Sequence, residues 1–263
     1  MGTRALDLPP RAGWNWLIKG WTLFRKSPSG MLVLTSTYLG IMFFLAVLIP
    51  FAGAVLVLIL NPGINAGLMT GCRMIDRGLP VTPSVVFSPF FEENRRLAKP
   101  FLRLGVWYAI CGIGVSMLTS LFGTIDAAQL MQAGVESADA AAQALNLLAI
   151  TSVLYTPVMM LFWYAPALVL WHDITPQKAL FFSLVTVWRN RGAFLLYAMG
   201  WMLWTVAIVG AFTVIMSMLP LPAFLSGAIN FVMLMSVFAV TLSTFYPSYI
   251  DVFEGHAADI EAN

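Results

Sequence analysis

The chain has 263 residues, of which 60% are hydrophobic and only 10% are charged, and its formal net charge at pH 7 is +2. Soluble domains carry about 25% charged residues, so this composition excludes an ordinary soluble protein and indicates an integral membrane protein. The small net charge gives no support to nucleic-acid binding.

The 14 Lys and Arg residues are confined to three windows, at 4–26, 73–103 and 178–191. The segments between and after these windows are long, apolar and rich in aromatic residues. This alternation predicts three basic regions on one side of a membrane, separated by three excursions across it. Cytoplasmic segments of membrane proteins are enriched in Lys and Arg, so we expect the three windows, and hence both termini, to be cytoplasmic.

Residues 1–30 form the first predicted element, a cytoplasmic segment with an amphipathic helix. The apolar residues that recur there at helical spacing are Trp14, Leu17, Ile18 and Trp21. Such a helix suits the membrane interface, with its Trp side chains at headgroup depth. Ser27-Pro28 then has the form of an N-cap followed by a first-turn proline, which predicts the start of a new helix.

Six apolar stretches follow, and they predict transmembrane helices at about 31–49, 51–72, 102–122, 146–171, 193–219 and 223–245. Each has about 20 residues or more, enough to cross a hydrocarbon layer of ~30 Å at ~1.5 Å per residue. A helix is expected because lipid offers the backbone no other hydrogen-bond partners. Short turns at 50 and 220–222 favour tight pairing of consecutive spans.

The predicted fold class is therefore an all-α integral membrane protein, a single domain over 1–263. Its six transmembrane helices form three hairpins preceded by cytoplasmic amphipathic or interfacial helices. The loop at 123–145 is acidic and lacks Lys and Arg, so we expect it outside, and the acidic tail at 246–263 is expected in the cytoplasm.

The helix-start pattern recurs at Thr82-Pro83 and at Thr175-Pro176, where it predicts a cytoplasmic helix that continues to Asn190. Two interpretations of this recurrence remain open. The chain has an internal repeat of amphipathic helix, basic break and hairpin, or similar interface patterns arose independently.

The predicted spans contain no Asp, Glu, Lys, Arg or His away from their ends. Ion-coupled carriers and intramembrane hydrolases need such groups, so we expect no enzymatic activity, no catalytic residues, no cofactor and no metal site. His172 and Asp173 are adjacent, but neighbours in sequence do not face each other on a helix, and Asp173 is better explained as a cap of the next helix. Cys72 and Cys111 are expected to be small packing residues.

The most distinctive polar feature is Asn61-Pro62-Gly63-Ile64-Asn65, near the middle of the second span. Pro62 predicts a kink or break, and the two Asn side chains, four residues apart, share one helix face. Either the broken helix exposes a substrate site, or small residues and Asn side chains pack against another helix, as the GxxxG spacing of Gly67 and Gly71 favours. A candidate polar intramembrane site would combine Asn61, Asn65, Pro157 and Asn230.

Three sequence blocks carry a resemblance to a known family. They are Trp14-Asn-Trp-Leu-Ile-Lys-Gly-Trp-Thr-Leu-Phe-Arg-Lys-Ser-Pro, Trp163-Tyr-Ala-Pro-Ala-Leu-Val with Ala179, Ser183 and Arg189-Asn190 downstream, and Tyr246-Pro-Ser-Tyr-Ile-Asp-Val-Phe. The chain resembles a proteobacterial family of six-helix inner-membrane proteins of unknown function. More distantly, it is similar to the membrane domain fused to some glycerophosphodiester phosphodiesterases. The resemblance implies a bacterial inner-membrane location, and it carries over no established activity.

The preferred hypothesis is a non-enzymatic inner-membrane protein that acts through lipid or protein contacts at its cytoplasmic face. The expected partners are anionic lipid headgroups or another membrane protein, and the candidate contact residues are Trp14, Lys19, Trp21, Arg25, Lys26, Lys178, Arg189 and Arg191. One alternative is a small-solute transporter or permease that uses the Asn61–Asn65 region. Another is an accessory subunit of a membrane complex.

Overall fold

The structure is a computed structural model that describes residues 5–49, 52–91, 95–122 and 138–255. Over these residues every regular element is a helix. In chain order the elements are α1 (Ala12–Lys26), α2 (Pro28–Leu48), α3 (Ala52–Asp76), the 3₁₀ helix η1 (Pro83–Phe90), α4 (Arg95–Phe122), α6 (Ala138–Phe162), α7 (Ala165–His172), α8 (Pro176–Arg189), α9 (Arg191–Met218), α10 (Ala223–Tyr249) and the π-helical turn η3 (Ile250–Glu254).

The described residues include six helical stretches that are long and apolar enough to cross a membrane, which confirms the expected number. Five of them are α2, α3, α4, α9 and α10, the last continued by η3, and the fourth in chain order is α6 together with α7. The predicted loop at 123–145 and tail at 246–263 lie partly outside the described residues, so neither is placed as a whole.

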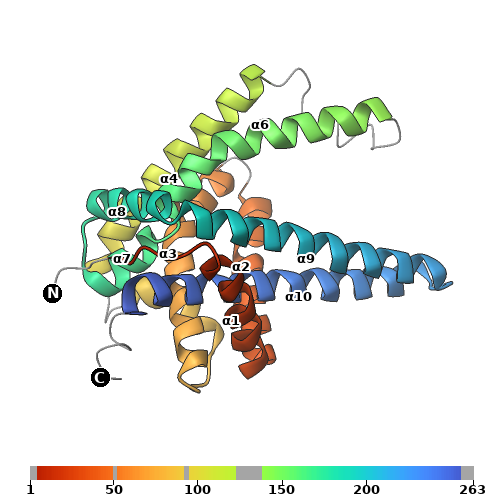
Figure 1. Cartoon of the computed structure of the whole chain (residues 1–263), viewed down its shortest axis with the longest axis horizontal. Helices are drawn as coiled ribbons and strands as arrows, with labels where there is room; N and C mark the ends of the chain where they lie inside the picture. The colour runs from red at the N-terminus through yellow and green to blue at the C-terminus, as the bar shows by residue number, and fades with distance from the viewer. Residues whose placement is uncertain (1–4, 50–51, 92–94, 123–137, 256–263) are drawn as a thin grey trace.

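The helices pack in an order that the chain alone does not suggest. α2 packs against α3 and α4 against α6, but α10 packs against α2, and α1 lies against both α9 and α10. In Figure 1, α4 and α6 extend away from the other helices as one pair, while α9 and α10 extend in a different direction. Their far ends are therefore surrounded by little protein: in the apolar stretches of α6–α7 and of α9 only 6% of residues are buried, against 39% in α3.

The first helix packs on the protein through one face and leaves its predicted apolar face partly exposed. The buried residues of α1 include Gly13, Trp16 and Leu23, while Trp14 and Trp21 of the predicted apolar face are nearly half exposed. A Cβ atom on Gly13 would lie 1.9 Å from the carbonyl oxygen of Ala193, so only glycine permits this approach of α1 to α9. Glycine carries no hydrophobic signal, so the periodicity did not reveal this packed face of α1. The position of the Trp14–Trp21 face at the membrane interface stays a prediction.

The structure confirms the helix starts predicted from the Ser/Thr-Pro pattern, but it does not contain the predicted break in the second span. α2, η1 and α8 begin at Pro28, Pro83 and Pro176, each one residue after the predicted cap. However, α3 is a continuous helix through Pro62, so of the predicted kink or break the break at Asn61–Asn65 is wrong, and the kink stays a prediction. Proline removes one hydrogen bond and disturbs one carbonyl, and the packed surroundings of α3 accommodate this loss.

The real break in a spanning segment lies at residues 163–164, between α6 and α7. Ser183 of α8 compensates for it: its hydroxyl accepts a hydrogen bond from the Tyr164 N–H at 2.9 Å and donates one to the Met160 carbonyl at 2.8 Å. Two backbone groups that the break leaves without helical partners are thereby satisfied, as an apolar environment requires.

The three family-like blocks meet in one hydrophobic core. Trp16 from the first block, Tyr164 from the second and Tyr249 from the third are each fully buried there. The Tyr164 hydroxyl donates a hydrogen bond to the Ser248 carbonyl at 3.3 Å, and the ring of Trp16 packs edge-on against Phe194. Segments more than 80 residues apart thus form a single structural centre at the end of the molecule that carries the basic residues.

Candidate functional site

The predicted polar residues of α3 line a cavity of about 340 Å³. Its walls come from α2, α3, α4, α6–α7 and α10, and its polar side chains include those of Tyr38, Asn61, Asn65, Tyr108 and Tyr155. We call this space the polar cavity. Asn61 lies nine residues into α3, about 13 Å from its first residue, so the cavity is at the depth of the hydrocarbon layer if α3 spans it.

Hydrogen bonds connect these side chains across helices. The Asn61 Oδ1 atom accepts from the Tyr38 hydroxyl at 3.2 Å and from Asn65 Nδ2 at 2.9 Å. The hydroxyls of Tyr108 and Tyr155 bond to each other across the wall formed by α4 and α6. The predicted sharing of one helix face by the two Asn residues is therefore present, and it creates a joined amide pair rather than two separate sites.

The other members of the candidate intramembrane site lie elsewhere. Pro157 is exposed on α6 and is not among the residues that line the polar cavity. Asn230 lies toward the far end of α10, where its Nδ2 atom bonds the Ser226 carbonyl of its own helix at 2.8 Å. The structure thus brings together Asn61 and Asn65 with three tyrosines that sequence reasoning did not connect, because those tyrosines come from three other helices.

The glycines beside the Asn pair have a packing role. A Cβ atom on Gly67 would lie 2.0 Å from the carbonyl oxygen of Val86, so this position brings η1 against α3, and Gly71 faces Leu34 of α2. The GxxxG spacing therefore does mark a close approach, with η1 and α2 as the partners. Within α3, packing and cavity-lining residues occupy different faces.

At the basic end of the molecule, half of the candidate lipid-contacting cations have internal partners. Lys19 is 2.6 Å from Asp251, Lys26 is 2.6 Å from Asp76, and Arg189 pairs with Asp7. These pairs join α1 to η3, α1 to α3, and α8 to the N-terminal segment. The acidic residues therefore hold these elements together through ion pairs. The distribution of positive charges along the chain does not show which cations are paired.

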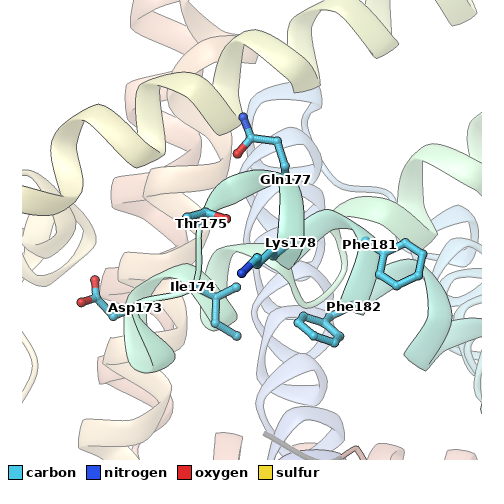
Figure 2. A pocket seen from close by; sticks show the side chains of 7 residues that line it. All are labelled: Asp173, Ile174, Thr175, Gln177, Lys178, Phe181 and Phe182. Atoms are coloured by element: carbon cyan, nitrogen blue, oxygen red, sulfur yellow. The ribbon is translucent and has the colours of Figure 1, made fainter. Parts of the chain in front are cut away.

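The remaining candidate cations have no ion-pair partner among the described residues, and aromatic side chains lie beside them. Arg25 follows Trp21 by one helical turn, and the Arg191 guanidinium lies 5.7 Å from the centre of the Trp188 ring. Lys178 lies on the first turn of α8 and Phe181 and Phe182 on the next, and Figure 2 shows all three side chains leaving this helix. Trp188 and Phe181 are each 62% exposed.

A second polar group at this end was not predicted. The Arg73 guanidinium lies 4.2 Å from the centre of the Trp171 ring and pairs with Glu254. His172 does not face Asp173 but hydrogen-bonds through Nε2 to the Tyr249 hydroxyl at 2.6 Å. Asp173 ends α7 in a left-handed conformation, and Thr175, not Asp173, is the N-cap residue of α8.

The Arg73–Glu254 contact joins α3 to η3, and the His172–Tyr249 contact joins α7 to the end of α10. Their partners are far apart in sequence, so no local pattern reveals them. Among the described residues, no group of three or more His, Cys, Asp or Glu side chains is placed to hold a metal ion.

Comparison with known proteins gives one informative relative. The chain is 36% identical over 206 residues to a probable inner membrane protein of Burkholderia thailandensis, and the match covers 74% of each protein. No family model matches the chain, and no solved structure matches it. Together with the six apolar helices, this similarity identifies a multi-pass inner-membrane protein. The chain belongs to the same family as the Burkholderia thailandensis inner membrane protein.

Proposed function

We propose that this protein is a non-enzymatic inner-membrane protein that binds anionic lipids at its basic face. The observation that carries the proposal is the set of three cations, Arg25, Lys178 and Arg191, that have no ion-pair partner among the described residues and stand beside exposed aromatic side chains. Juxtamembrane Lys and Arg gain about 1 kcal/mol each near an anionic leaflet, while Trp favours headgroup depth.

The surfaces next to these cations suit lipid. Lys178, Phe181 and Phe182 line a surface hollow of about 620 Å³ at the start of α8, and the Lys178 side chain points toward its Ile174 side (Figure 2). Trp14 and Trp21 border an apolar groove of about 230 Å³ whose other wall includes Trp201 and Trp204. An anionic lipid fits both features, because its headgroup phosphate can lie beside the cations while its acyl chain covers the aromatic surface.

This proposal is narrower than the expectation from sequence. Lys19, Lys26 and Arg189 hold helices together through their carboxylate partners, and a lipid phosphate would have to compete with those partners. Because an exposed ion pair is already charge-compensated, we assign the three paired cations a structural role. The three others carry the proposed lipid contact.

The test replaces Arg25, Lys178 and Arg191 together with Gln in the full chain. Binding of phosphatidylglycerol to the protein in a neutral detergent is then measured by native mass spectrometry, with phosphatidylcholine as the comparison lipid. Loss of three contacts of about 1 kcal/mol each predicts affinity for phosphatidylglycerol reduced by about two orders of magnitude. The affinity for phosphatidylcholine should be unchanged.

The matched control is the double substitution K19Q/D251N, which removes an ion-paired lysine and leaves the net charge unchanged. We expect it to bind phosphatidylglycerol as the wild type does. Equal binding by the triple variant and the wild type would refute the lipid proposal.

Two alternatives remain as separate proposals. The polar cavity favours a small-solute transporter or permease, although the continuous α3 removes the broken helix on which that hypothesis was built. The low burial of α6 and α9 favours an accessory subunit whose partner covers these helices. Co-purification of one membrane protein at fixed stoichiometry would support the second alternative over lipid binding alone.

A further inference from the structure

The polar cavity has hydrogen-bonding capacity that the protein itself does not use. The Asn61–Asn65 pair engages Asn61 Oδ1 and one hydrogen of Asn65 Nδ2. Within the described residues, Asn61 Nδ2 and Asn65 Oδ1 have no hydrogen-bond partner, and neither belongs to the buried polar atoms that lack one. Both atoms are therefore accessible, and the cavity that their side chains line offers them a ligand position.

An accessible donor and acceptor at this depth need a partner. Lipid supplies no hydrogen bonds, and a polar group without one in an apolar medium costs free energy. An amide NH₂ and an amide oxygen one helical turn apart match a molecule that accepts and donates within a few ångströms, as a hydroxyl or carbonyl group does.

The rest of the lining defines the ligand's charge. None of the described residues that line the polar cavity is Asp, Glu, Lys, Arg or His. An ion placed there would have no counter-charge and would carry a large desolvation cost. The ligand must therefore be uncharged.

The walls and volume of the cavity also limit the size and polarity of the ligand. Aromatic rings of Phe162, Trp163, Phe238 and Phe245 contribute to the walls, and Trp163 stacks on Phe245 with ring centres 4.4 Å apart. Its volume of about 340 Å³ is at the small end of the range of ligand pockets, roughly 300–1,000 Å³. Such walls suit a flat, apolar molecule.

We infer that the polar cavity is a binding site for a small uncharged aromatic molecule that carries a hydroxyl or carbonyl group, held by Asn61 and Asn65. This site is distinct from the lipid surface proposed above: it involves no cation and lies among other helices. Binding does not require that the ligand be transported.

The test uses 1-naphthol as the probe and 1-methylnaphthalene, which lacks the hydroxyl, as its matched apolar analogue. Saturable binding of each to the full-length protein in a neutral detergent is measured by equilibrium dialysis, with the empty detergent micelle as blank. We expect saturable binding of 1-naphthol to the wild type and about tenfold weaker binding to Asn61→Leu, because one hydrogen bond is worth about 1–1.5 kcal/mol. Binding of 1-methylnaphthalene should not weaken.

Asn230→Leu is the control variant, since it removes the same side-chain type from a spanning helix outside the cavity. It should bind 1-naphthol as the wild type does. If Asn61→Leu fails to fold, Asn65→Leu tests the same pair by removing the Oδ1 atom that has no partner among the described residues, and it should weaken 1-naphthol binding selectively.

Three results would overturn the inference: no saturable binding to the wild type, equal binding by wild type and cavity variants, or equal weakening in Asn230→Leu. None of these results depends on anionic lipid. The cation variants in turn leave the polar cavity intact, so the two proposals can fail separately.

Discussion

Single residues decide where the helices touch, and Gly13 shows this most directly. It brings α1 against the Ala193 carbonyl of α9, and that position has no room for a side chain. We predict that Gly13→Ala lowers the free energy of unfolding by about 1–3 kcal/mol, because the added methyl group forces backbone to move. The measurement is thermal unfolding of the detergent-solubilised protein.

Gly210 provides the control for this prediction. It lies on α9 with nothing within 4 Å of its ideal Cβ position. Gly210→Ala should therefore leave stability unchanged or raise it by up to about 1 kcal/mol through helix propensity. If both variants unfold at the same temperature, the close packing of α1 on α9 is incorrect.

Ser183 is a second residue whose importance the sequence conceals. Its hydroxyl satisfies the two backbone groups at the break between α6 and α7. We predict that Ser183→Ala destabilises the protein by about 1–3 kcal/mol, since a buried donor and acceptor lose their partner. Thermal unfolding checks this, with Ser217→Ala as the comparison.

Ser217 is suited to this purpose because its hydroxyl bonds the Val214 carbonyl within α9 and is exposed. A loss of stability as large in Ser217→Ala as in Ser183→Ala would show that Ser183 has no special role at the break.

At the scale of elements, local sequence determines where helices begin better than where they bend. The Ser/Thr-Pro pairs mark the starts of α2, η1 and α8 because proline fixes φ and needs no donor in a first turn. A proline inside a helix has no single outcome. Pro62 is accommodated, whereas the break at 163–164 coincides with hydrogen bonds from α8 that replace the lost ones.

The candidate intramembrane site also has a part that local sequence predicts and a part that it does not. The shared face of Asn61 and Asn65 follows from helix geometry, so it could be predicted from a spacing of four. Their connection to Tyr38, and the tyrosine pair opposite, depend on how α2, α4 and α6 are placed. No pattern within one helix contains that information.

For the whole molecule, orientation in the membrane is the prediction that remains to be measured. The positive-inside rule places the N-terminus, the 73–103 window and the 178–191 segment in the cytoplasm. Alkaline phosphatase, active only outside the cytoplasm, should be active when fused within 123–145. It should be inactive when fused at 85 or after the C-terminus. Activity in the reverse pattern would overturn the orientation and the lipid surface that depends on it.

The sequence by itself determined the class of protein and the number of spans, because hydropathy and segment length are local quantities summed over about 20 residues. The tertiary structure alone decided which charges are free and which polar atoms face a cavity. Lys19 lies 232 residues from its partner Asp251, and Tyr38 lies on a different helix from Asn61. Charge pairing and cavity formation depend on contacts between distant segments, so they follow from packing and not from periodicity.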